Sequence, residues 1–155
     1  MADVLPYASS VLVAAAPQTL YGMVADVTRM GEWSPVCTSC WWDPGADTGV
    51  GSWFTGRNET PTHTWETRCR VTVADPGRAF AFTVDGVGAI WNYTFADRGT
   101  TTLLTESWLL LPAGVDNYRR RFGDDADRQI AIRRDRAVEG IGQTLAALRA
   151  AAESP

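Results

Sequence analysis

Several residue types are scarce in this sequence, and each scarcity argues against a class of protein. All 14 basic residues are arginine and none is lysine; high-GC codon usage would explain this, so we attach no mechanism to it. The 18 acidic residues outnumber the basic ones, which gives a formal net charge of -4. Because phosphate backbones are bound by basic faces, nucleic acid is not an expected partner.

Long hydrophobic runs are scarce as well, and we expect no leader sequence. No apolar stretch approaches the ~20 residues that span a bilayer, so no membrane partner is expected. The beginning, Met1–Val4, has neither the basic segment nor the apolar core of a signal peptide. We therefore expect a cytoplasmic protein whose three cysteines stay reduced.

Hydrophobic residues, by contrast, are plentiful. The chain of 155 residues is 45% hydrophobic and 21% charged, which is typical of one globular domain, residues 1–155, with a core that needs neither disulfides nor metal. Seven tryptophans are an excess for this length. Tryptophan usually lines cores, interfaces or ligand pockets, so the excess favours one of these uses.

The first and last elements are predicted from apolar spacing. Tyr7–Ala15 is predicted to be a strand because its second half is β-branched and apolar, and a helix is predicted to open at Pro17 and to end by Gly31. The segment Pro112–Asp125 is polar and is predicted to be irregular. A long amphipathic helix follows over Ala126–Ala152.

Turn signals separate six further strand candidates between these ends. We place them at Val36–Asp43, Gly51–Asn58, His63–Ala74, Arg78–Asp85, Ala89–Ala96 and Thr100–Leu111. Strands joined by short turns pair as antiparallel neighbours, and the last helix must bury its apolar face on their concave side. The predicted fold is α+β: a seven-stranded curved antiparallel sheet wrapped around a long C-terminal helix, with a short helical segment after the first strand.

Six short segments carry a family resemblance that spans nearly the whole chain. They are Val13–Pro17, Val24–Met30, Trp33–Pro35, Gly51–Asn58, Asp75–Arg78 and Thr102–Trp108. In this order the sequence resembles the SRPBCC superfamily of START domains, birch-pollen-type allergens and polyketide cyclase/dehydratase-like proteins, and looks closest to its actinobacterial single-domain branch. The resemblance implies a helix-grip fold with a pocket but no particular reaction, since this fold hosts carriers, cyclases and sensors. One departure is Val36, where that branch is expected to have Glu.

Strand alternation assigns side chains to the expected pocket. On His63–Ala74 the odd-numbered residues, with Val71 and Val73 among them, should face inward. On the last strand Leu104, Glu106 and Trp108 share a face. We predict the following ligand-binding residues: Trp65, Phe80, Phe82, Trp91, Tyr93, Glu106, Trp108 and Arg134.

Glu106 and Arg134 are the two charged residues in this set. Desolvation in an aromatic pocket would raise the pKa of Glu106 unless a cation compensates. Arg134 lies in the apolar stripe of the C-terminal helix, where an unpaired charge is expensive to bury. We hypothesise that the two approach each other or both contact a polar group of the ligand. The alternative is that Arg134 lies past the sheet edge and extends to solvent.

Other motifs are discounted. In Cys37-Thr38-Ser39-Cys40 the two cysteines lie three residues apart on a strand and should point to opposite faces, so we interpret them as ordinary thiols and expect no metal. His63, the single histidine, is expected at the pocket rim or in solvent. No glycine-rich phosphate loop or dinucleotide fingerprint is present, so no cofactor is expected.

Two functions stay open at this point. The first is binding of a hydrophobic, aromatic or polycyclic small molecule in an internal cavity between sheet and helix; the aromatic lining favours a cavity over a filled core. The second is a polyketide cyclase/dehydratase acting in the same cavity, with Glu106, Tyr93 and His63 as candidate catalytic residues. The oligomeric state, a homodimer included, is left open.

Overall fold

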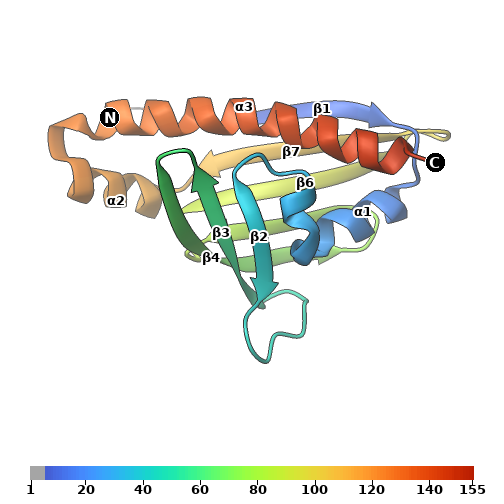
Figure 1. Cartoon of the computed structure of the whole chain (residues 1–155), viewed down its shortest axis with the longest axis horizontal. Coiled ribbons are helices and arrows are strands. Elements are labelled where there is room, and N and C mark those ends of the chain that lie inside the picture. The colour runs from blue at the N-terminus through green and yellow to red at the C-terminus, as the bar shows by residue number, and fades with distance from the viewer. Residues whose placement is uncertain (1–5) are drawn as a thin grey trace.

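The computed structural model describes residues 6–155, in the order strand, helix, six strands and C-terminal helices (Figure 1). The strands are β1 (Tyr7–Val13), β2 (Cys37–Trp42), β3 (Trp53–Thr60), β4 (His63–Asp75), β5 (Ala79–Val84), β6 (Ala89–Asp97) and β7 (Thr102–Leu110). The helices are α1 (Pro17–Ala25), α2 (Pro112–Phe122) and α3 (Ala126–Glu153), with short 3-10 helices η1 (Val27–Glu32) and η2 (Gly123–Asp125). The predicted α+β fold is confirmed.

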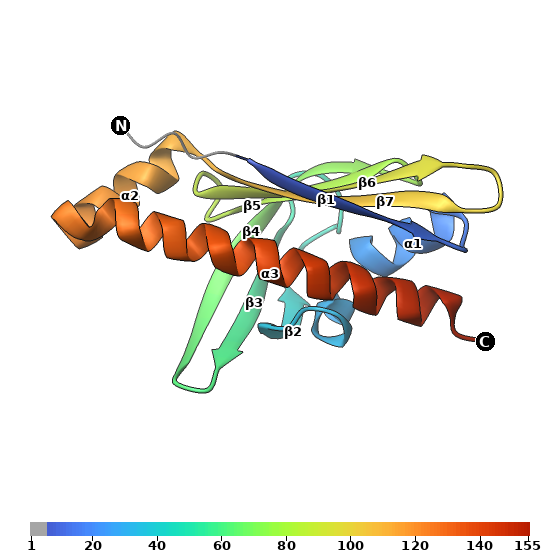
Figure 2. The ribbon, with the colours of Figure 1, turned by 90° about the horizontal axis from the view of Figure 1, so that it is seen from above.

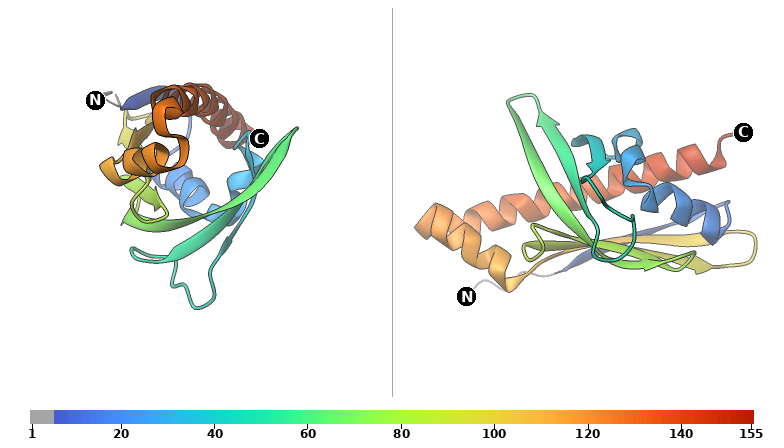
Figure 3. Two further views of the ribbon diagram at one scale, coloured as in Figure 1. Left: turned by 90° about the vertical axis from the view of Figure 1, so that its left-hand side faces the viewer. Right: turned by 90° about the horizontal axis from the view of Figure 1, so that it is seen from below.

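The strands form one antiparallel sheet in the order β1-β7-β6-β5-β4-β3-β2. The first strand therefore forms an edge and pairs with the last one. Figures 2 and 3 show that the sheet curves into a cup and that α3 runs across its open side, while α1 lies within the curve. The space between this sheet and α3 is where the sequence places a pocket.

The apolar face of α3 differs by one position from the stripe that helical spacing predicts, which consists of Ile130, Arg134, Val138, Ile141, Leu145 and Leu148. Its buried residues are Ala126, Ile130, Ala137, Ile141, Thr144, Leu145 and Leu148. Small residues at 137 and 144 face the sheet, whereas Val138 is only partly buried. The prediction followed the larger side chain because apolar spacing alone does not separate two adjacent helix positions near the edge of a face.

The segment predicted to be irregular is helical instead. Pro112 occupies the first turn of α2, a position at which its missing N–H costs nothing. Gly114 brings this helix against the end of the sheet, since a Cβ there would collide with the carbonyl of Gly88. Val115 and Tyr118 pack on the core. Tertiary packing therefore outweighs the polar composition of this segment.

A β-bulge corrects one inward assignment on β4. The register with β5 shifts between Val71 and Val73. Val71 is buried as predicted, but Val73 is 38% exposed. One extra residue in a strand reverses the faces of all residues beyond it, so alternation holds only up to the bulge.

Candidate functional site

A buried carboxyl lies on the inner face of the sheet. Glu106 on β7 is 2% exposed, and its neighbours along that face are Leu104 and Trp108. Tyr93 lies opposite on β6 and donates its hydroxyl to Glu106 Oε1 at 2.8 Å. Burial raises the pKa of Glu106 to about 8, and the Tyr93 hydrogen bond lowers it only in part. The carboxyl is therefore mostly protonated at neutral pH.

Two buried polar atoms on β7 lack partners. Among residues 6–155, neither Oε2 of Glu106 nor Nε1 of Trp108 has a hydrogen-bond partner. Each such atom costs about 1–3 kcal/mol relative to a satisfied one. Two of them, two residues apart on one strand face, call for an explanation other than packing.

A cation that the sequence did not single out lies beside Trp108. The guanidinium Cζ of Arg133, on α3, lies 5.5 Å from the Trp108 ring centroid and 5.6 Å from that of Trp91. Burial lowers the pKa of Arg133, and the like charge of Arg136 lowers it further. Whether Arg133 or Arg134 faces the aromatic rings depends on how α3 is rotated about its axis. The spacing of the large apolar residues predicted a rotation that favours Arg134, one position further along the helix.

Arg134, the predicted partner of Glu106, lies elsewhere. Its Cζ is 5.8 Å from the ring centroid of Tyr7 on β1. Oε2 of Glu106 receives no hydrogen bond from it. A direct approach of these two residues is thus not supported, and the arginine that lies over Trp91 and Trp108 is Arg133. That both residues contact a polar group of the ligand stays a prediction.

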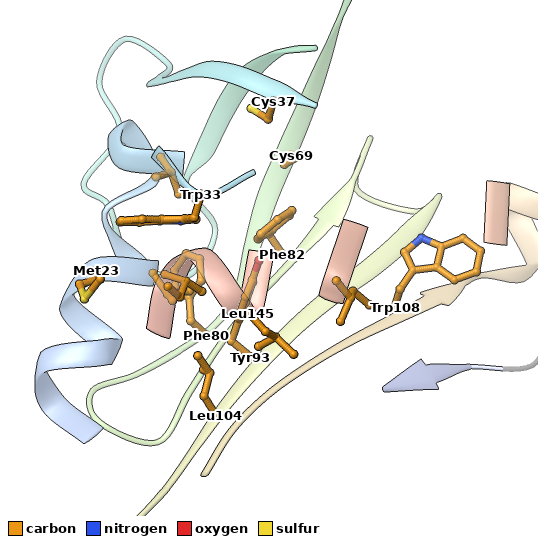
Figure 4. Packing of buried hydrophobic residues seen from close by; sticks show 14 of the residues in the cluster. Met23, Trp33, Cys37, Cys69, Phe80, Phe82, Tyr93, Leu104, Trp108 and Leu145 are labelled. Atoms are coloured by element: carbon orange, nitrogen blue, oxygen red, sulfur yellow. The ribbon is translucent and has the colours of Figure 1, made fainter. Parts of the chain in front are cut away.

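The predicted aromatic residues divide into two groups. Phe80 and Phe82 are buried and lie close together, with Phe82 in edge contact with Phe54 at 5.1 Å between centroids. Figure 4 shows Phe80, Phe82 and Tyr93 gathered in one cluster and Trp108 standing apart from it. Glu106 is hydrogen-bonded to Tyr93 of this cluster and lies two residues from Trp108 on β7.

The β3–β4 hairpin carries two of the predicted residues away from this face. His63 is exposed and stacks on Trp65, with ring centroids 5.2 Å apart. The hairpin projects from the body of the molecule (Figure 2). Strand β4 is three strands from β7 in the sheet, and neighbouring strands are about 4.8 Å apart. His63 and Trp65 are therefore not brought together with Glu106 and Tyr93.

A surface hollow of about 430 Å³ lies along the seam between β1 and α3. Ser9 and Leu145 line it, and Ser9 is the register partner of Glu106. The hollow is thus one strand away from the buried carboxyl. Tyr93, Glu106 and Trp108 are not part of its lining, so it is a different space from the predicted internal cavity.

The two cysteines of the Cys37-Thr38-Ser39-Cys40 motif face the same way, contrary to the prediction. A register shift after Cys37 places it opposite Asn58 and Cys40 opposite Gly56, two residues apart on β3. The two Sγ atoms are 3.3 Å apart and buried. The shift cancels the expected alternation. Over the part of the chain that the structure describes, no three His, Cys, Asp or Glu side chains are grouped to hold a metal ion.

Comparisons with known proteins agree with this architecture. Residues 7–153 match the family model described as polyketide cyclase/dehydrase and lipid transport. The polyketide-cyclase-like protein Cgl2372 from Corynebacterium glutamicum is 43% identical, with a TM-score of 0.73, over 96% of this chain and 91% of that one. No curated protein matches the chain.

More distant structures share the fold. Protein CV1439 from Chromobacterium violaceum is 18% identical, with a TM-score of 0.70, over 97% of this chain and 99% of that one. The di-domain ARO/CYC StfQ from the steffimycin biosynthetic pathway is 14% identical, with a TM-score of 0.71, over 97% of this chain and 51% of StfQ. At these identities the likeness concerns the fold alone. No helix of residues 6–155 is long and apolar enough to cross a membrane.

Proposed function

The chain belongs to the polyketide cyclase/dehydrase and lipid transport family, and from that premise we propose that it binds a hydrophobic, aromatic or polycyclic small molecule between the sheet and α3. One observation carries the proposal. Oε2 of Glu106 and Nε1 of Trp108 are buried without partners on the face that would contact the ligand. Polar atoms of a ligand would satisfy both, while its body would contact Phe82 and Tyr93.

The seam between β1 and α3 supports a route to this face. The hollow there is lined by Ser9, next to Glu106 in the register, and by Leu145, which is otherwise buried. Strand β1 is an edge strand and pairs with β7 alone. A small separation of α3 from β1 would therefore open the interior without breaking the rest of the sheet.

The test is a titration of the intrinsic tryptophan fluorescence with flavonoids, polyketides, steroids and fatty acids. We expect saturable quenching by at least one polycyclic compound. In Glu106→Leu the unsatisfied carboxyl is gone, so the affinity should fall about tenfold for loss of one hydrogen bond while thermal stability is kept or raised. Glu66→Gln, on an exposed carboxyl of β4, is the control that should change neither.

Two results would contradict the binding function. One is the absence of saturable quenching by any apolar compound. The other is a Glu106→Leu variant that loses stability and keeps its affinity, since this pattern would make Glu106 a structural residue.

We also propose a second candidate, a polyketide cyclase/dehydratase activity. Glu106 favours it, because a carboxyl with a pKa of about 8 beside the Tyr93 hydroxyl can exchange a proton near neutral pH. Such a group could enolise and dehydrate a poly-β-keto chain. Glu106→Gln should then abolish release of water, followed by mass spectrometry, while a bound cyclic product still quenches fluorescence. If the native protein binds the poly-β-keto chain but does not convert it, the enzymatic function is excluded and only the binding function remains.

A further inference from the structure

Arg133 differs from the arginines of this chain that form ion pairs. Six arginines of residues 6–155 pair with a carboxylate on the surface: Arg29, Arg57, Arg68, Arg119, Arg128 and Arg149. Arg133 is partly buried, yet within the described residues it forms no ion pair or hydrogen bond, and its guanidinium lies over the rings of Trp91 and Trp108. Arg133 is thus more buried than these six arginines and has no carboxylate partner among the described residues.

The surroundings of Arg133 do not neutralise it. The groups that act on its charge are Tyr118 of α2 and the like charge of Arg136 on its own helix, and neither is a carboxylate. The rings of Trp91 and Trp108 attract the guanidinium through their faces, but such contacts are worth only about 0.5–2 kcal/mol. Partial burial without an ion pair removes part of the hydration of this charge, and the ring contacts offset that cost only in part, so an anion at this position would stabilise the site.

The neighbouring unpartnered atoms are donors too. Oε1 of Glu106 accepts from Tyr93, so in the neutral carboxyl the proton lies on Oε2 and is available for donation. Nε1–H of Trp108 can only donate, as can a guanidinium. We call Glu106, Trp108 and Arg133 the donor cluster. A ligand that satisfies this cluster needs oxygen atoms that accept hydrogen bonds, and the oxygens next to Arg133 should carry a negative charge.

We infer that the ligand is an organic acid: an aromatic or polycyclic body lies on the inner face of the sheet, and its carboxylate pairs with Arg133 over Trp91 and Trp108. Planar guanidinium and carboxylate groups match in a two-bond arrangement. A second acceptor, such as a ring carbonyl, would meet Glu106. This inference rests on the proposed binding function and deepens it by naming the chemical class of the ligand.

The test uses two fluorescent probes that share one polycyclic body. Pyrenebutyrate carries a carboxylate where pyrenebutanol carries a hydroxyl, and energy transfer from tryptophan reports binding of either. We expect the native protein to bind the acid more tightly, although the alcohol is the more hydrophobic of the two. Arg133→Met should weaken pyrenebutyrate about tenfold to a hundredfold, the range for a charged hydrogen-bonded pair, and change pyrenebutanol less than about threefold.

Arg128→Met is the matched control. Arg128 is an exposed arginine of the same helix, paired with Asp125, and its replacement should leave both affinities unchanged. Circular dichroism confirms that each variant folds. Should Arg133→Met not fold, Arg133→Gln and Arg133→Lys replace it, and the lysine variant should keep part of the preference for the acid.

The outcomes separate the two proposals. If Arg133→Met lowers the affinity for both probes equally, or for neither, the acid-binding inference is wrong and the binding function is still supported. A native protein that prefers the alcohol overturns the inference as well. If the native protein binds neither these probes nor any compound of the wider panel, both proposals fail.

Discussion

Two buried regions of the same sheet differ in how their polar atoms are satisfied. At the β2 end, the thiols of Cys37 and Cys40 contact each other, and Cys40 lies 3.8 Å from the sulfur of Met30. At the β7 end, Oε2 of Glu106 and Nε1 of Trp108 lack hydrogen-bond partners among the described residues, and Arg133 has no carboxylate partner there. Sulfur groups are buried at little cost, whereas a carboxyl, an indole N–H and a guanidinium each need a partner. The chain completes the first region by itself, and we interpret the second as completed by a ligand.

The largest expected effect concerns Glu106 and pH. Its pKa is raised to about 8 in the folded protein, against an ordinary value of 4.5 when unfolded. Below pH 4.5 both states are protonated; between 4.5 and about 8 only the unfolded state ionises, so folding loses stability as pH rises through this window. The loss is on the order of 4 kcal/mol. Urea unfolding across this range should show it in the native protein and not in Glu106→Gln.

Comparing the pH dependence of unfolding in the native protein and in Glu106→Gln isolates the contribution of the Glu106 carboxyl. Asp43 and Asp47 have lowered pKa values, because they accept hydrogen bonds, and so titrate below the window. Their contributions are shared by the native protein and the variant and cancel in the difference. If the free energy of unfolding varies with pH in the same way in both proteins, the carboxyl of Glu106 has the partners it needs within the chain and the prediction is wrong.

A smaller effect is expected at the thiol end. A Cβ at Gly56 would lie 3.1 Å from Cys40 Sγ and 3.3 Å from Cys37 Sγ, closer than usual contacts. Gly56→Val should therefore lower the free energy of unfolding by about 2 kcal/mol through overpacking. Adding Cys40→Ala should restore about half of the loss, as measured by urea unfolding. If the two substitutions lower the free energy of unfolding additively, the overpacking in Gly56→Val does not involve Cys40.

The smallest effect should come from Arg133. Arg133→Met removes an incompletely satisfied charge and two ring contacts together, so the free energy of unfolding should change by less than about 1 kcal/mol. Differential scanning calorimetry measures this at neutral pH. A loss of several kcal/mol would mean that the guanidinium already has a partner in the chain, and the contrast between the two regions would disappear.

Much of the fold was accessible from the sequence, because each prediction rested on a local pattern. The turns at Asp43–Gly45, Asp75–Gly77 and Asp97–Gly99 separate the strands, and alternation correctly put Glu106 on the buried face of β7. The helix at 112–122 was missed because its composition is polar and its stability comes from docking at Gly114. Sequence patterns do not carry contacts of that kind.

The candidate site was accessible only in part. Tyr93 and Glu106 were identified from alternation, but their hydrogen bond depends on the register of β6 with β7. The shared face of Cys37 and Cys40 follows from a bulge that no local signal marks. Alternation is reliable within an unbroken strand and carries no information about where the ladder shifts.

The sequence by itself determined the order of the elements, the antiparallel meander and the presence of a carboxyl among aromatic side chains. These follow from periodicities of two and 3.6 residues, which are local properties of the chain. Only the tertiary structure decided that Arg133 and not Arg134 lies over Trp91 and Trp108. Neighbouring positions on a helix differ by about 100°, so the choice depends on how α3 is rotated against the sheet, and packing of the whole core sets that rotation.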